Sequence, residues 1–356
     1  MRPYSLPTAL TPRVGNRKWE EEIMNSKLRA RRLGLAAGAA AMLAVGLATA
    51  SPAAAETSAS VSNDTLTVNG GSGDDRIALR LAAGAAGTLQ VDFGDDGSVE
   101  HSFDRSTFSR IEVFAGSGND QFRVDQANGA FTDEALTIDG GNDHDTLDGG
   151  DGVEVFIGGN GDDAIDGNRG NDTALLGNGQ DSFRWDAGDG SDVVEGDNGT
   201  DTLDFNGAGV DEIMSLSPNG ERSLFLRNPG NVRMDMNGVE RLDLSALGGA
   251  DTVTVNDMSG TDFRRADVDL SAPTGAAEGA ADIVTVNGTE QADNIHVKSA
   301  GTRVAVDGLR TETVVAGGEP IDQLQVNALG GDDKVNVDPA ASVLIGVAVE
   351  LGSGQN

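Results

Sequence analysis

Acidic side chains recur at a fixed interval in the middle of this 356-residue chain, and each lies in the same local context. The interval is nine residues, widened once by the inserted pair Trp185-Asp186. Glycines precede each acid, and an apolar residue such as Leu147 or Ile165 follows two places later. The acids in this pattern are Asp145, Glu154, Asp163, Asp172, Asp181, Asp192 and Asp201. Seven such contexts in phase indicate a repeated site.

These residue types suit the binding of a hard divalent cation. Glycine reaches positive φ without steric cost, so glycine-rich turns leave backbone carbonyls free to point at an ion. Calcium prefers six to eight oxygen ligands at about 2.3–2.6 Å, from carboxylates and carbonyls together, so we predict Ca²⁺ as the cofactor. Solvated turns or a flexible linker are the alternative for a Gly-, Asn- and Asp-rich segment. That alternative predicts neither a fixed phase nor a regular apolar residue.

The units follow the consensus Gly-Gly-x-Gly-x-Asp-x-U-x, where U is a large apolar residue, from Gly140 to Asp204. In this pattern the chain resembles the hemolysin-type (RTX) calcium-binding repeat family. The resemblance implies a right-handed β-roll in which two nonapeptides make one turn, so ions would lie between alternate units on the same side. One side would carry Asp145, Asp163, Asp181 and Asp201, and the other side Glu154, Asp172 and Asp192.

A slower repeat flanks the nonapeptides and occurs three times, near residues 62–139, 205–271 and 283–351. Each copy opens with an aspartate two residues before an isoleucine, and a second aspartate-containing turn follows after a long interval. The paired residues are Asp75 with Asp120, Asp211 with Asp251, and Asp293 with Asp333. Only Asp75 and Asp120 keep most of the motif, so we add these two to the candidate calcium ligands. A structural turn without a metal explains the other turns equally well.

Segments that alternate apolar and polar residues lie between these turns. TLQVDF near Val91 and LQVNA near Val326 are typical of strands, and no segment after Ala55 has a convincing helical period. We therefore predict one all-β solenoid, a right-handed parallel β-roll or β-helix with Gly/Asp-rich calcium-binding turns. Its predicted parts are residues 56–139, the nonapeptide roll 140–204, a second unit 205–282 and a third unit 283–356.

Residues 1–55 have the features of a secretory signal peptide with an N-terminal extension. A translation start at Met24 would give a compact basic n-region without that extension. A basic stretch precedes the apolar segment Leu33–Ala50, and Ala53-Ala54-Ala55 forms a small-residue cleavage site. We therefore predict a secreted, extracellular protein with no membrane insertion after cleavage. A transmembrane anchor is the alternative, although an apolar segment this short and this rich in Ala and Gly is marginal for spanning a bilayer. Hemolysin-type proteins typically carry an uncleaved C-terminal export signal, so this leader departs from the family.

The net charge limits the partners of the chain. Lys and Arg number 25 against 58 Asp and Glu, which gives −33 for the whole sequence. Residues 1–55 hold eight Lys or Arg and three Glu, so the remainder carries −38. Nucleic acid and anionic membranes are therefore poor partners for the mature chain. The absence of cysteine excludes disulfides and thiolate zinc sites.

Residues for catalysis are scarce. The three histidines are His101, His144 and His296, and the sequence contains neither a His-Glu-x-x-His zinc motif nor a Gly-x-Ser-x-Gly elbow. The only tyrosine, Tyr4, precedes the cleavage site. We therefore predict a non-enzymatic, secreted calcium-binding repeat protein with a structural, adhesive or assembly role and a partner at the cell surface or in the matrix. The alternative is an extracellular carbohydrate-active enzyme, lyase- or epimerase-like, on a β-helix with calcium-stapled turns.

Overall fold

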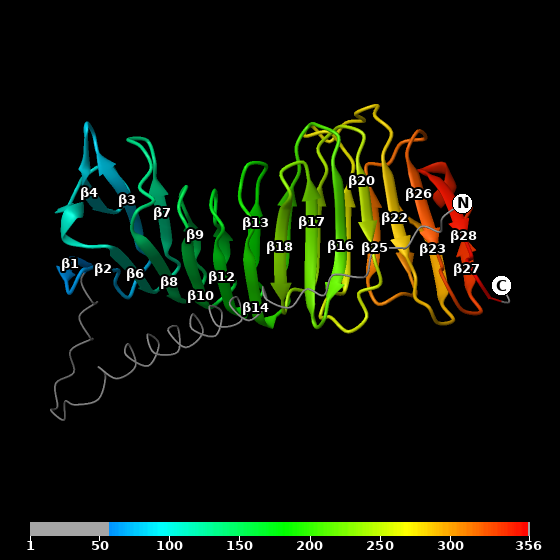
Figure 1. Ribbon diagram of the computed structural model, residues 1–356, viewed down its shortest axis with the longest axis horizontal. Helices are drawn as coiled ribbons and strands as arrows, with labels where there is room; N and C mark the ends of the chain where they lie inside the picture. Colours follow the sequence, from blue (N-terminus) through cyan, green and yellow to red (C-terminus); the bar gives the residue numbers. More distant parts are fainter. Residues whose placement is uncertain (1–56, 355–356) are drawn as a thin grey trace, which may run out of the picture. The chain divides into compact units, whose positions relative to one another are not determined.

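The structure, a computed structural model, describes residues 57–354, which form two long β-sheets (Figure 1). Each sheet has 14 strands. The described residues contain no α-helix, only the short 3-10 helices Arg105–Thr107 (η2) and Ala341–Val343 (η3). The predicted all-β class is therefore confirmed.

Neighbouring strands in each sheet are hydrogen-bonded, and their spatial order differs from their order in the chain. The first sheet contains, from one edge to the other, β1 (Ser58–Ser62), β2 (Thr65–Asn69), β6 (Arg110–Ser117), β8 (Ala135–Asn142), β10 (Glu154–Asn160), β12 (Thr173–Gly179), β14 (Val193–Gly199), β18 (Val232–Asn237), β17 (Arg222–Asn228), β16 (Ile213–Asn219), β20 (Thr252–Val255), β22 (Ile283–Asn287), β26 (Gln323–Asn327) and β28 (Gly346–Glu350). The second sheet contains β27 (Lys334–Val337), β23 (Asn294–Ala300), β24 (Arg303–Asp307), β25 (Glu312–Ala316), β21 (Arg265–Asp269), β19 (Arg241–Ser245), β15 (Thr202–Asn206), β13 (Ser182–Trp185), β11 (Ala164–Asp166), β9 (Thr146–Asp148), β7 (Gln121–Asp125), β3 (Arg76–Ala82), β4 (Ala85–Phe93) and β5 (His101–Asp104).

Consecutive strands of the nonapeptide block alternate between the two sheets, and each pairs in parallel with the strand one turn away. Thr146 of β9 is opposite Ala164 of β11, so one turn takes 18 residues. The turn from β13 to β15 takes 20 residues, because the insertion Trp185-Asp186 extends the end of β13 and the loop that follows it. Two nonapeptides therefore make one turn, as expected of a β-solenoid.

The core lies between the two sheets and is built from the apolar residue that follows each acid. Leu147, Ile165, Phe183 and Leu203 of the second sheet are buried, as are Phe156, Ala174 and Val194 of the first. The inserted Trp185 also packs inward, where its ring stacks on Phe205 with 4.1 Å between ring centroids. The apolar residues thus occupy alternate positions of the strands, so their side chains all lie on the sheet face that is buried.

Three antiparallel meanders enlarge single turns of the solenoid: β3–β4–β5, β16–β17–β18 and β23–β24–β25. Each meander lies in one copy of the slower repeat, and its first strand pairs in parallel with a strand of the next turn. Arg76 of β3 is opposite Gln121 of β7, and Asn294 of β23 is opposite Lys334 of β27. The long sequence intervals of the slower repeat, 45 residues in the first copy and 40 residues in the third, are therefore each one turn that contains a meander.

In the middle copy of the slower repeat, the strand register differs by one residue from the register that the sequence spacing predicts. Ile213 is opposite Thr252, so this turn is one residue shorter than the pairing of Asp211 with Asp251 predicts. Ile213 is exposed and Met214 is fully buried, so the acid two places before the inward residue is Glu212. The residue that stacks on Asp251 is therefore Glu212 and not Asp211, which the sequence repeat pairs with it, because two adjacent acids leave the phase undetermined in the sequence.

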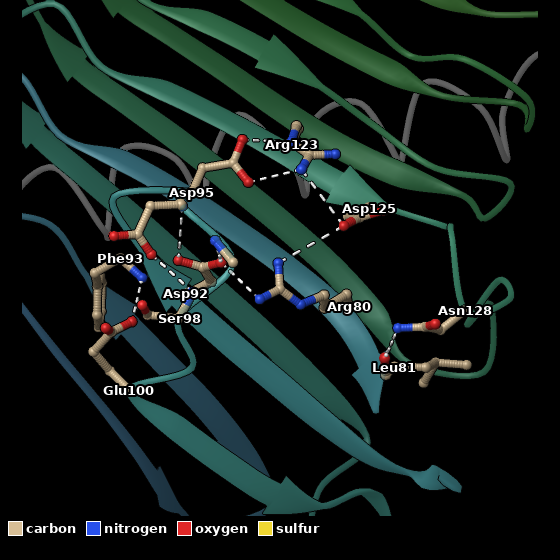
Figure 2. A network of polar contacts seen from close by, with 12 residues as sticks. Arg80, Leu81, Asp92, Phe93, Asp95, Ser98, Glu100, Arg123, Asp125 and Asn128 are labelled. Carbon is tan, nitrogen blue, oxygen red and sulfur yellow. Dashed lines mark hydrogen bonds and ion pairs between the residues drawn. The ribbon is translucent and has the colours of Figure 1, made fainter. Parts of the chain in front are cut away.

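A polar network joins the first meander to the neighbouring turn (Figure 2). Arg80 of β3 forms a 2.7 Å ion pair with the fully buried Asp92 of β4. Arg123 of β7 donates two hydrogen bonds, of 2.6 and 2.7 Å, to the carboxylate of Asp95. Asp92 and Asp95 of the first meander are thus each paired with an arginine, as burial of a charge requires.

The predicted signal peptide, its Met24 start and its cleavage site fall in residues 1–56 and lie outside the described residues. Among residues 57–354 no helix has the length and apolar character needed to cross a membrane.

Candidate metal centres in the carboxylate ladders

The repeated aspartates form a hydrogen-bonded ladder along one side of the solenoid. The backbone N–H of Asp145 donates to Oδ1 of Asp163 at 2.8 Å, and the N–H of Asp163 donates to Oδ1 of Asp181 at 2.8 Å. The N–H of Asp181 continues the series to Oδ1 of Asp201 at 3.0 Å. Each carboxylate therefore satisfies a backbone donor of the preceding turn.

A second ladder runs along the opposite side. The N–H of Glu154 donates to Oδ1 of Asp172, and the N–H of Asp172 donates to Oδ1 of Asp192, both at 2.8 Å. These acids lie at or directly before the start of strands of the first sheet, whereas those of the other ladder directly precede strands of the second sheet. The structure thus contains the two-sided arrangement that the resemblance to the hemolysin-type repeats implies.

The ladders extend well beyond the nonapeptides. Asp75 and Asp120 precede Asp145 in the first ladder, through 2.8 Å bonds from the N–H of Asp75 to Asp120 and from the N–H of Asp120 to Asp145. At its other end the N–H of Asp201 donates to Oε2 of Glu240 at 2.8 Å. Two further ladders contain Glu212, Asp251, Asp282 and Asp322, and Asp293 with Asp333.

Sequence reasoning missed Glu212, Glu240, Asp282 and Asp322, because the turns around them lack most of the motif glycines and their spacing is irregular. One signal was present. Each of these acids lies two residues before a buried apolar residue, namely Met214, Leu242, Val284 and Leu324.

Interior members of the ladders have a buried carboxylate oxygen with no hydrogen-bond partner in the protein. The side chains concerned are almost fully buried, and the unpartnered atom is Oδ2. They are Asp120, Asp145, Asp163, Asp172, Asp181, Asp201, Asp251 and Asp282. A buried carboxylate oxygen without a partner is costly, so each such atom marks a position where a cation would be favourable.

The first member of each ladder differs, because a nearby backbone N–H of its own turn satisfies it. Oε2 of Glu154 accepts from Gly150 at 3.2 Å, and Oδ2 of Asp293 accepts from Thr289 at 2.7 Å. Gly71 donates in the same way to Oδ2 of Asp75. The geometry thus separates Asp75 and Glu154 from the interior ligands, whose second oxygen has no donor.

Glycine at the first position of a unit makes room for two oxygens. A Cβ on Gly158 would lie 2.7 Å from Oδ2 of Asp163 and 2.4 Å from the carbonyl oxygen of Leu176 in the next turn. Gly140 has the same surroundings, with Oδ2 of Asp145 at 2.5 Å and the carbonyl oxygen of Gly158 at 2.8 Å from its Cβ position. A carboxylate oxygen and a carbonyl oxygen beside one Cα are ligand types that calcium prefers.

Burial has a large effect on these carboxyl groups. It raises the pKa of Asp145 to about 7, of Asp163 to about 6 and of Asp172 to about 9. The pKa of Glu154, of Asp192 and of Asp201 rises to about 7 for the same reason. Neighbouring carboxylates of the ladders shift most of these pKa values in the same direction, while the hydrogen bond from the preceding turn opposes it. A bound divalent cation would instead favour the charged form.

Side chains alone do not complete a metal site. Within residues 57–354 no three His, Cys, Asp or Glu side chains converge as a ligand set. Consecutive members of a ladder are one turn apart, so an ion between them would draw its remaining ligands from the backbone carbonyls of the turns. That mixture fits the residues present, since calcium accepts carbonyl oxygens readily.

The histidines occupy separate places. His144 lies in a turn of the nonapeptide block, and its Nδ1 accepts a 2.7 Å hydrogen bond from the N–H of Asp162. His296 of β23 contacts Asp307 at 3.0 Å, and the ring of His101 lies between those of Phe93 and Phe103. Each ring thus has a structural partner within the solenoid.

No family model matches this chain, and no curated protein matches it. The likeness to the hemolysin-type repeats therefore rests on the nonapeptide pattern itself.

Proposed function

We propose that this protein is a secreted, non-enzymatic calcium-binding repeat protein with a right-handed β-roll. The carrying observation is the unpartnered, buried Oδ2 of the interior ladder aspartates, which at Asp145, Asp163 and Asp201 lies beside a glycine and a carbonyl oxygen of a neighbouring turn. Calcium is the cation that the oxygen ligands and the motif favour. The ligands would be Asp120, Asp145, Asp163, Asp181 and Asp201 on one side, and Asp172 and Asp192 on the other. Asp75 and Glu154, as ladder starts, would contribute less.

Folding and ion binding are coupled in this proposal. In the absence of calcium, stacked carboxylates about 4.8 Å apart repel by roughly 1 kcal/mol per pair even in water, and the glycine-rich turns are costly to order. Calcium between turns removes the repulsion and stabilises the fold. A chain exported into a medium with millimolar calcium would therefore become ordered there. Its role would be structural, adhesive or in assembly at the cell surface or in the matrix.

The test is a calcium titration of the purified chain followed by far-UV circular dichroism. We expect the β signal to increase with millimolar calcium and to reverse with a chelator. Asp163→Asn should weaken this response, whereas Asp133→Asn should not, because the Asp133 side chain is 83% exposed. Identical spectra with calcium and with chelator would overturn the proposal.

One observation supports the carbohydrate-active alternative. A groove of about 340 Å³ lies on β19, β21, β24 and β25, and its lining includes Arg241, Arg265, Asp267 and Arg303. Paired basic and acidic side chains on a sheet face are suited to hydrogen bonding with sugar hydroxyls and carboxylates. Incubation of the protein with a panel of polysaccharides, with product analysis, tests this alternative directly.

A further inference from the structure

The loop of residues 271–281 between β21 and β22 brings an additional carboxylate to one turn of the third ladder. Oε2 of Glu278 accepts a 3.0 Å hydrogen bond from the N–H of Gly249, in the turn that ends at Asp251. A Cβ on Gly248 would lie 2.6 Å from the same oxygen, so the carboxylate is seated directly against this glycine. The turn lies outside the nonapeptide block, and its sequence, LGGAD, keeps only part of the repeat motif.

Three carboxylate oxygens at this place have no hydrogen-bond partner. They are Oδ2 of Asp251, Oδ2 of Asp282 and Oε1 of Glu278. The side chains of Asp251 and Asp282 are only 1% and 2% exposed. The N–H of Asp251 donates to Oδ1 of Asp282 at 2.8 Å, so the two aspartates are adjacent members of the ladder. Burial, followed by nearby acids that include Glu278, raises the pKa of both to about 7.

The start of the same ladder shows how the protein can neutralise such a charge from within. Glu212 is fully buried, and Nε of Arg227 donates to its Oε1 at 2.5 Å. The Arg227 guanidinium also lies over the ring of Trp185, 5.1 Å from its centroid. In contrast, no ion pair in the described part of the chain involves Asp251, Glu278 or Asp282. The charge of these three groups is therefore left without a protein counter-ion.

We propose that the turn of residues 247–251, with Asp251, Glu278 and Asp282, forms a calcium site separate from the nonapeptide roll. Asp251 and Asp282 supply buried oxygens from the ladder, and backbone carbonyls of the turn complete the ligand set. The three side chains do not converge on one point in the structure, because Glu278 is held at the N–H of Gly249. Glu278 follows the exposed residues 273–277, so its carboxylate is the ligand that moves onto the ion. The inference rests on the proposed function only for the choice of calcium, whose coordination tolerates irregular geometry.

Hydrogen exchange of the full chain, with calcium chloride or with chelator, tests the site. We expect calcium to slow exchange in residues 247–251 and 276–283 by about tenfold or more, since ligands order the loops they bind. Glu278→Gln should abolish this slowing while residues 140–204 still respond, and calorimetry should show one ion fewer. Glu221→Gln removes the same charge from an exposed turn and should change neither readout.

The outcomes separate this site from the nonapeptide roll. Slowing at 247–283 without a response at 140–204 would support the new site and overturn the proposed roll. A response at 140–204 alone, or equal slowing at 247–283 in the Glu278→Gln protein, would overturn the new site. Circular dichroism of the variant in chelator should match the parent, and a loss of slowing then reports binding. If the Glu278→Gln protein is misfolded, Glu278→Ala with a spectrum in chelator that matches the parent must reproduce the loss for the site to stand.

Discussion

The two carboxylate oxygens of the ladder aspartate in each turn have different roles. Oδ1 accepts the N–H of the preceding turn, so it takes part in stacking whether or not an ion is present. Oδ2 has no donor in the interior turns, and in the turns of Asp145, Asp163 and Asp201 it lies beside a glycine and a carbonyl oxygen. The structural and the proposed cation-binding roles thus belong to different atoms of one residue.

The glycine beside Oδ2 should be irreplaceable for steric reasons alone. Gly158 has no positive φ, yet its Cβ would be 2.4 Å from the Leu176 carbonyl oxygen and 2.7 Å from Oδ2 of Asp163. We expect Gly158→Ala to lower the free energy of unfolding by about 1–3 kcal/mol, as overpacking does, and to weaken the calcium response. Gly73→Ala is the matched control, because a Cβ there meets nothing within 4 Å. Equal denaturation midpoints for the two variants would contradict this account.

The ladder carboxyls also predict an unusual pH dependence for the calcium-free protein. Burial raises the pKa of Asp145 and Asp192 to about 7 and of Asp172 to about 9, against about 3.9 in an unfolded chain. A raised folded-state pKa contributes stability that is fully present below pH 4 and is lost as the pH rises through about 7–9.

In chelator, the urea midpoint should therefore fall between pH 5 and pH 9. The pKa of Asp95, which Arg123 lowers, belongs to a group with the opposite trend, but its effect lies below pH 4, outside that window. With calcium the slope should flatten or reverse, because the ligands bind in the charged form. A midpoint that rises with pH in chelator would show that the ladder carboxyls are not buried as described.

At the scale of elements, the parallel strands and the ladders share one register. Asp163 donates its N–H to Asp181 in the neighbouring turn, whereas Asp172 belongs to the ladder on the opposite side. The stacking of alternate nonapeptides is what the resemblance to the hemolysin-type repeats implies. The strict phase, with one two-residue insertion, then shows which acids belong to each side. The meanders could not be predicted, because strands β16 and β17 alternate apolar and polar residues whether they pair in parallel or in antiparallel fashion.

A double-mutant cycle measures that register. Asp163→Asn combined with Asp181→Asn should be non-additive in calcium-dependent stability by about 0.5–3 kcal/mol, as for contacting residues. Asp163→Asn combined with Asp172→Asn should come closer to additivity, although some coupling remains because Ile165 and Ala174 share the core. Equal couplings, or a larger coupling across the two sides, would be incompatible with ions held between turns of one side.

At the scale of the whole molecule, calcium-dependent and calcium-independent parts should alternate along the two sheets. The meanders carry buried ion pairs, Arg80 with Asp92 in the first and Arg227 with Glu212 in the second. The arginines within the nonapeptide block are exposed, as in the pair of Arg184 with Asp186. The acidic composition alone suggests disorder, and only the pairing pattern shows which acids are neutralised within the protein.

Solenoid turns contact only their neighbours, so local stability should vary along the chain. In chelator we expect amide exchange to be fastest in residues 140–204, where interior carboxylates lack counter-ions, and slower in β3–β4 and β16–β17, whose arginines remain paired. Millimolar calcium should slow exchange in 140–204 by several orders of magnitude more than in the meanders, since binding there restores the missing charges. Mass-spectrometric exchange on the full chain resolves these segments. A uniform change along all strands would mean that the two sheets fold as one cooperative unit and that the meander ion pairs do not act as independent anchors.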